Sequence, residues 1–191
     1  MSPYLQRVAA PYEEARDRLR RLTDGLADDA FNAKPAPSSW SAAECVVHLN
    51  RIAKGYLPAF EAALSADAPR GDGPFHYGWV TRRFIEAVRP GSRPLPTAPA
   101  MKPPGASGLR SDIDRDRALG RFESDIARYL AVIEAADGYD LAQITVASPF
   151  LRVLRVPMGG MLEAMGLHAV RHVAQAERAV AATSGAVPAS G

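Results

Sequence analysis

Residues 157–183, PMGGMLEAMGLHAVRHVAQAERAVAAT, are the stretch on which our interpretation of the fold depends. They combine strong helical character with two histidines four residues apart. At about 100° per residue, His168 and His172 fall roughly 140° and 180° from Glu163, among apolar side chains and beside Gln175. Two imidazoles on such a face need a partner, because a buried polar group without one is costly. The spacing therefore favours a helix that carries two ligands of a shared metal ion.

The length and composition predict an ordinary globular protein. A chain of 191 residues has the size of one domain with a sizeable core, so we expect a single domain over residues 1–191. With 47% hydrophobic residues, 23% charged residues and a net charge of +2, nothing points to nucleic acid. No apolar run approaches the roughly 18 residues of a membrane span, and the N-terminus is charged where a signal peptide would be apolar. The single cysteine, Cys45, excludes an intrachain disulfide, and we expect a cytoplasmic protein with no membrane partner.

Apolar residues recur at spacings of three and four in four segments, which is the pattern of amphipathic helices. We expect one or two short helices besides them, since residues 75–88, FHYGWVTRRFIEAV, favour a short helix or a packed aromatic segment. No alternating strand pattern stands out. The chain is therefore predicted to be an all-α four-helix bundle. The four predicted helices cover residues 4–26, 41–63, 112–136 and 157–183.

The connections between these helices differ in character. Residues 28–39, DDAFNAKPAPSS, are predicted to form a loop, and residues 181–191 a frayed tail. The Pro-rich insert, residues 88–110, is too rich in proline and glycine for regular structure. It is also long for a passive connector, so it is either disordered or a lid over a pocket.

The second predicted helix has a well-marked start. Ser41 and Glu44 have the spacing of a capping box, and Trp40 and Cys45 are placed to form a hydrophobic staple around it. His48 follows at the edge of the apolar face. It is the natural third ligand to the pair on the last helix, because a bundle can bring ligands together from facing helices.

Two other metal sites with histidine pairs are excluded by the sequence. A zinc protease helix reads H-E-x-x-H, but Ala169 stands where its general base would be. A di-iron bundle needs Glu-x-x-His pairs, yet none of the four histidines has a glutamate three residues before it. From spacing alone, histidines satisfied within a core stay an equal alternative to metal ligands.

Two segments carry a family resemblance. SSWSAAECVVHLNRI, residues 38–52, and GLHAVRHVAQAE, residues 166–177, together resemble the DinB-like, or YfiT-like, superfamily of metal-dependent enzymes. The resemblance implies a four-helix bundle with up-down-down-up connections. It also implies a divalent metal ion, zinc or nickel, bound by His48, His168 and His172. The Pro-rich insert has no counterpart in that pattern.

Four further residues are weaker candidates for the pocket. Cys45 lies one turn before His48 and could reach a metal, but its staple position favours packing. Glu44 could act as a base, although the capping box already accounts for it. Gln175 continues the histidine stripe and could hydrogen-bond a ligand. His76 could line the mouth of the pocket, and a surface histidine is the default there.

We therefore expect a metal-dependent enzyme whose ion activates a water or a thiol in an open coordination position. The resemblance implies either an S-transferase that uses a low-molecular-weight thiol or a hydrolase. The expected substrate is a small molecule. The expected oligomeric state is a monomer or a homodimer. The alternative is a non-catalytic ligand-binding or stress-associated protein with a structural metal. A fourth protein ligand such as Cys45 or Glu44 would favour that alternative.

Overall fold

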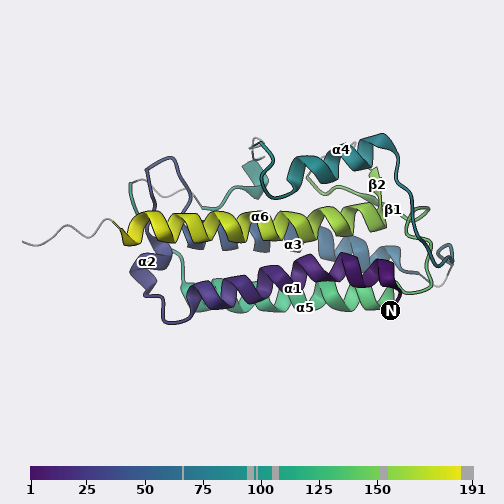
Figure 1. Ribbon diagram of the computed structural model, residues 1–191, viewed down its shortest axis with the longest axis horizontal. Helices are drawn as coiled ribbons and strands as arrows, with labels where there is room; N and C mark the ends of the chain where they lie inside the picture. Colours follow the sequence, from purple (N-terminus) through teal and green to yellow (C-terminus); the bar gives the residue numbers. More distant parts are fainter. Residues whose placement is uncertain (66, 94–96, 98, 105–107, 151–154, 186–191) are drawn as a thin grey trace, which may run out of the picture.

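The computed structural model describes the whole chain except residues 66, 94–96, 98, 105–107, 151–154 and 186–191. Four long helices lie side by side along the longest axis of the molecule (Figure 1). They confirm the predicted all-α bundle. The long helices are α1 (Pro3–Thr23), α3 (Ala42–Ala63), α5 (Arg115–Ala135) and α6 (Met158–Ser184). The shorter elements are α2 (Asp28–Asn32), α4 (Trp79–Val88), the 3₁₀ turn η1 (Pro99–Met101), and the strands β1 (Thr145–Ala147) and β2 (Arg155–Pro157).

Helices α1 and α6 run side by side in the same direction. The Tyr12 hydroxyl donates a hydrogen bond of 2.7 Å to the Leu162 carbonyl. One and a half turns further along α1, the Arg18 guanidinium holds both carboxylate oxygens of Glu177, at 3.0 and 2.6 Å. Because the residue numbers rise together on both helices, the pair is parallel.

Helices α3 and α5 form the second parallel pair. The Asn50 side-chain amide donates to the Ala118 carbonyl over 2.9 Å, and Arg128 pairs with Glu61 at 2.7 Å. In Figure 1 this pair runs against α1 and α6. The order is therefore up-down-down-up, as the family resemblance implies.

The start of α3 is the capping box that the sequence predicts. The Ser41 hydroxyl accepts from the Glu44 backbone N–H at 3.1 Å, and the Glu44 carboxylate accepts from the Ser41 N–H at 2.9 Å. The buried Lys34 ammonium lies 3.5 Å from the other oxygen of the same carboxylate. This paired carboxylate holds the first turn of α3 in place, four residues before the buried His48.

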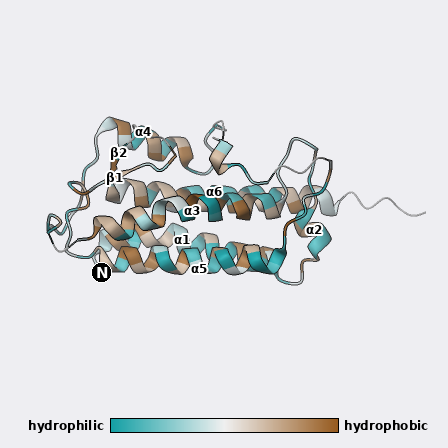
Figure 2. Cartoon of the chain, turned by 180° about the vertical axis from the view of Figure 1, so that it is seen from behind, coloured by the Kyte–Doolittle hydropathy of each residue, from teal (hydrophilic) through white to brown (hydrophobic). Residues whose placement is uncertain are grey.

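The core lies between the long helices. Figure 2 shows hydrophilic and hydrophobic residues interleaved along each of them, as expected for amphipathic helices. The side chains of Tyr12, Phe60, Leu57 and Ile133 are fully buried. Among the described residues, no helix is long and apolar enough to cross a bilayer.

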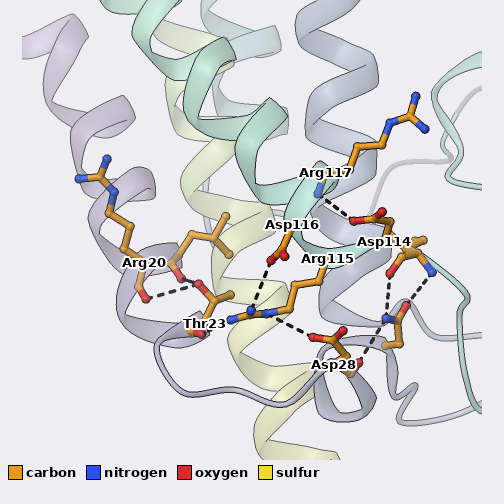
Figure 3. Close-up of polar contacts among 10 residues, drawn as sticks. Arg20, Thr23, Asp28, Asp114, Arg115, Asp116 and Arg117 are labelled. Atoms are coloured by element: carbon orange, nitrogen blue, oxygen red, sulfur yellow. Dashed lines mark hydrogen bonds and ion pairs between the residues drawn. The ribbon is translucent and has the colours of Figure 1, made fainter.

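A polar cluster ties the loop after α1 to the start of α5 (Figure 3). Arg115, the first residue of α5, donates to the Thr23 carbonyl at 2.6 Å and lies 3.8 Å from the Asp28 carboxylate. Asp114 caps the helix by accepting from the Arg117 N–H at 2.9 Å. These contacts set where α5 begins.

The structure corrects the predicted loop over residues 28–39, because Asp28–Asn32 forms α2. A five-residue helix is too short to show a helical period in the sequence. Tertiary contacts hold it instead: Phe31 is fully buried, and the Asn32 side chain accepts a 2.6 Å hydrogen bond from Ser111.

The structure also adds a strand pair that the sequence did not predict. β1 and β2 pair antiparallel before α6, with Val146 opposite Val156, and only these central residues are buried. Three-residue strands show a single inward position each, so no alternating pattern can be recognised in the sequence.

The described residues of the Pro-rich insert, residues 88–110, include the last residue of α4 and one short regular element of their own. Residues Pro99–Met101 form η1, although the composition predicts no regular structure there. Four of the insert's described residues contact the ligand-bearing side of the bundle through hydrogen bonds: Ser92, Arg93, Met101 and Lys102. Residues 94–96, 98 and 105–107 lie outside the described residues, so the choice between a lid and a disordered segment stays a prediction for them.

Candidate metal centre

Three imidazoles from two helices converge inside the bundle. His48 comes from α3, and His168 and His172 come from successive turns of α6. Their candidate ligand atoms all lie within 4.8 Å of one another. Two of them, His48 Nε2 and His168 Nε2, are 3.1 Å apart. His48 and His172 are buried, and His168 is partly exposed.

Helix α1 packs closely against α6 at Gly166, two residues before His168. A Cβ added to Gly166 would lie 2.9 Å from the Tyr12 ring and 3.2 Å from Pro11. The absence of a side chain at Gly166 therefore lets α1 pack directly on the turn that carries His168.

The tautomer of His48 is set by the Pro-rich insert. Its Nδ1 lies 2.7 Å from the Met101 carbonyl oxygen. A carbonyl only accepts, so Nδ1 carries the proton and Nε2 presents its lone pair to the other two histidines. This is the arrangement of a metal-binding histidine whose second nitrogen is held by a backbone oxygen.

All three imidazoles are kept neutral. Burial is the main cause that lowers the pKa of His48, and it lowers the pKa of His168 to about 3 with help from His48 and Arg171. Burial and the two neighbouring histidines hold the pKa of His172 well below its usual range. Neutral imidazoles are the form that binds a metal.

The three histidines fit a divalent ion. Tetrahedral coordination with nitrogens about 2 Å from the ion places them about 3.3 Å apart, close to the 3.1 Å between His48 and His168. A hydrogen bond between those two rings would explain that contact alone, and it would not explain why the candidate ligand atoms of all three imidazoles lie within 4.8 Å of one another. Among the described residues, the cluster includes no carboxylate and no thiol. Three nitrogen ligands leave one position of a tetrahedral ion open.

Trp40 covers one side of the cluster. Its ring stacks on His172, with 5.7 Å between ring centroids and 27° between planes, and its centroid lies 5.0 Å from that of His48. The sequence pattern predicts only a hydrophobic staple for Trp40. The sequence signal that could have placed Trp40 at the cluster is its position directly before the capping box, about two helical turns before His48.

The Pro-rich insert is anchored from both ligand helices. On α3, Arg51 donates to the Lys102 carbonyl, next to the contact between His48 and Met101. On α6, Arg171 donates to the Ala87 and Arg93 carbonyls, each at 3.1 Å, and to the Ser92 hydroxyl. Residues of the insert and Ala87 at the end of α4 are thus held by side chains adjacent in sequence to, or one turn from, the metal-ligand candidates. The hydrogen bond between His48 and the Met101 carbonyl could not be predicted from the sequence, because every residue has a backbone carbonyl.

The other predicted pocket residues lie in different places. Glu44 is occupied by the cap of α3 and by Lys34. Cys45 is buried, and burial raises the pKa of its thiol far above the usual range, so it stays protonated. Gln175 interacts with His172 and acts against the downward shift of that pKa. Gln175 therefore contacts the cluster through His172.

His76 lines a separate cleft. This cleft has a volume of about 520 Å³ and lies between α1, α4 and α6, with Glu163 and Leu167 of α6 in its wall. Glu163 and Leu167 are on the side of α6 away from the histidines, so the structure does not bring His76 to the cluster.

Comparison with known proteins agrees with this arrangement. Residues 12–176 match the family model described as DinB superfamily, a span that includes all four long helices in whole or in part and all three histidines. No curated protein and no solved structure matches the chain.

Proposed function

This chain belongs to the DinB superfamily, and from that premise we propose that it is a metal-dependent enzyme acting on a small molecule. The observation that carries the proposal is the convergence of His48, His168 and His172, all neutral, with a 3.1 Å contact between two Nε2 atoms. These three side chains would hold a zinc or nickel ion. When bound, the ion would lower the pKa of a water or a thiol in its remaining position.

The chain's own residues prepare the site for this chemistry. The Met101 carbonyl keeps the His48 proton on Nδ1, so the ligand atom needs no tautomer change. Trp40 lies over two of the rings and excludes water from that side. Gln175, beside His172, is a neutral polar group that can hold a substrate or steady the imidazole without adding charge.

The donor set supports an anionic reacting group. Three neutral imidazoles leave the full charge of a divalent ion uncompensated, which favours a thiolate or a hydroxide in the open position. The chain's single thiol, Cys45, is buried and protonated, so the thiol would be a substrate. An S-transferase that uses a low-molecular-weight thiol is therefore the form of the proposal we would test first, and a hydrolase is the second.

Thermal stability of the metal-loaded protein tests this proposal. Low-molecular-weight thiols should stabilise the zinc- or nickel-loaded wild type, by about 2.7 kcal/mol at a hundredfold excess over Kd. The shift should vanish in the metal-free protein and in His48→Ala. His76→Ala is the matched control, because it removes a histidine outside the cluster, and it should behave as wild type.

The outcomes separate the branches. A thiol shift confined to metal-loaded wild type and His76→Ala supports the transferase, and turnover with electrophilic co-substrates then identifies the reaction. Equal shifts in His48→Ala place the thiol away from the ion. No shift with any thiol, together with turnover of ester or amide substrates, favours the hydrolase. Metal binding without either result favours a structural ion.

A further inference from the structure

A small cavity lies beside His168 in the interior of the bundle. Its volume is about 20 Å³, and a water molecule needs about 10–15 Å³ by this kind of measure, so it has room for one water. Most of the wall is apolar and aromatic. The three exceptions besides tyrosine are Asn50 of α3, Asp125 of α5 and His168 of α6.

Each of these three side chains has one buried polar atom without a hydrogen-bond partner among the described residues. The atoms are Asn50 Oδ1, Asp125 Oδ1 and His168 Nδ1. The remaining polar atoms of the first two are engaged, since Asn50 Nδ2 donates to a carbonyl at 2.9 Å and Asp125 Oδ2 accepts from Arg121 at 2.9 Å. Buried polar atoms are rarely left unpaired, and three on one cavity point to a common partner.

The role of His168 Nδ1 follows from the proposed metal site. Its Nε2 is the atom that faces His48 Nε2, so Nε2 would be the metal ligand. A neutral imidazole that gives the lone pair of Nε2 carries its proton on Nδ1. That buried N–H then requires an acceptor, and metal-bound histidines almost always have one.

We propose that one water in this cavity accepts a hydrogen bond from His168 Nδ1–H and donates to Asp125 Oδ1 and Asn50 Oδ1. The count closes, because a water has two donor hydrogens for the two acceptors and a lone pair for the single N–H. Three hydrogen bonds are typical of a buried water. The inference rests on the proposed metal function, and it assigns to Asp125 and Asn50 the part of positioning residues.

The consequence is that α5, which supplies no ligand, influences the ion. Through the water, the Asp125 carboxylate fixes the ring of His168 and makes its Nε2 a stronger ligand. The ion pair with Arg121 does not by itself explain why the Asp125 carboxylate is buried. The pair engages only Oδ2, and the buried Oδ1 has no hydrogen-bond partner among the described residues.

Zinc affinity, measured by competition with a chelator at fixed pH, tests the inference. Asp125→Leu removes the acceptor and fills the cavity, and it should weaken zinc binding about 10- to 100-fold. Asp125→Asn keeps the shape and one acceptor oxygen but loses the charge, so its loss should be smaller. Arg121→Ala is the matched control. It breaks the ion pair without touching the cavity, and its affinity should stay within about twofold of wild type.

A spectroscopic readout separates positioning from a structural effect. In zinc-loaded protein with ¹⁵N-labelled histidine, His168 should show a protonated, slowly exchanging Nδ1. This proton signal should shift in Asp125→Asn and exchange faster in Asp125→Leu. Thermal unfolding of the metal-free variants shows whether each has folded, and Asp125→Asn carries the test if Asp125→Leu has not.

Three results would overturn the inference. The first is wild-type zinc affinity and an unchanged His168 signal in the folded Asp125 variants. The second is an equal loss of affinity in Arg121→Ala, which would trace the effect to the ion pair. The third is a zinc-loaded crystal structure without water in the cavity. Failure of the wild type to bind zinc or nickel would instead overturn the proposed function.

Discussion

Helix α6 meets α1 on one side and α3 on another, and the two contacts are built differently. Toward α1, Gly166 lies against Tyr12, and the polar groups are paired: the Tyr12 hydroxyl with a carbonyl, and Arg18 with Glu177. Toward α3, the contact includes three converging imidazoles.

The polar atoms of the α3 contact are not all satisfied. The buried Nδ1 atoms of His168 and His172 have no hydrogen-bond partner among the described residues. A contact whose polar groups are all paired is explained by the fold, whereas unpaired imidazoles that converge indicate a ligand. The comparison predicts that substitutions toward α3 act on metal binding and substitutions toward α1 act on stability.

The largest expected effect is the loss of metal binding when one of the three candidate ligand histidines is replaced. His172→Ala removes one of three nitrogens and should weaken zinc or nickel binding by well over about 100-fold, beyond the effect of losing a partner of a ligand. Elemental analysis after gel filtration would measure the remaining metal. His76→Ala should keep a full equivalent, and full retention by both His168→Ala and His172→Ala would show that the cluster does not bind metal.

A smaller effect is expected on the α1 side. In Gly166→Ala the new methyl would lie 2.9 Å from the fully buried Tyr12 ring, so one helix must shift, at about 1–3 kcal/mol of the free energy of unfolding. Chemical denaturation measures it. Gly120→Ala in α5 is the matched control, because nothing lies within 4 Å of the added Cβ, and it should stabilise by about 0.5–1 kcal/mol.

Zinc affinity refines this prediction. If Gly166→Ala weakens metal binding as strongly as it weakens folding, the two faces of α6 are coupled through the helix. Unchanged metal binding in a destabilised protein would show that they are independent.

The smallest expected effect is the pH dependence of the free energy of unfolding of the metal-free protein. The folded-state pKa of His168 is lowered to about 3 from an ordinary 6.5, so the unfolded state binds more protons between these values. The contribution of neutral His168 to the free energy of unfolding is therefore fully present well above pH 6.5, and it is lost progressively as the pH is lowered. Between pH 6.5 and 5.5 the loss is about 1 kcal/mol for this histidine.

Urea unfolding of wild type and His168→Gln at the two pH values measures this contribution. The variant lacks the titrating group, so its stability should fall by about 1 kcal/mol less than that of the wild type. An equal fall in both proteins would mean that His168 is not held neutral by the fold.

Much of the fold and of the histidine set could be predicted from the sequence, because both depend on local chemistry. Apolar spacing marks the four long helices, and Ser41 with Glu44 marks the start of α3 within one residue. The position of His48 follows from that start. The His168 and His172 pair follows from the period of one helix.

Residues whose role depends on distant partners could not be predicted. Asn50 falls nearly opposite the apolar face on a helical wheel, yet it packs against α5, because α3 has helices on two sides. Asp125 left a weak signal, since it lies three residues after Phe122 and four before Tyr129 on the inner stripe of α5. His76 was predicted to be a surface histidine by default, with the mouth of the pocket as the other possibility, and it is exposed in another cleft.

The amino-acid sequence by itself determined the four long helices and the inward pair His168 and His172, because periodicity and capping act within a few residues of the chain. Only the tertiary structure decided that the Met101 carbonyl orients His48, that Trp40 covers the cluster, and that Asp125 and Asn50 share a cavity with His168. These contacts join residues that lie far apart in the chain, and His48 and Met101, for example, are 53 positions apart. They depend on how whole helices pack, and no local pattern in the chain encodes them.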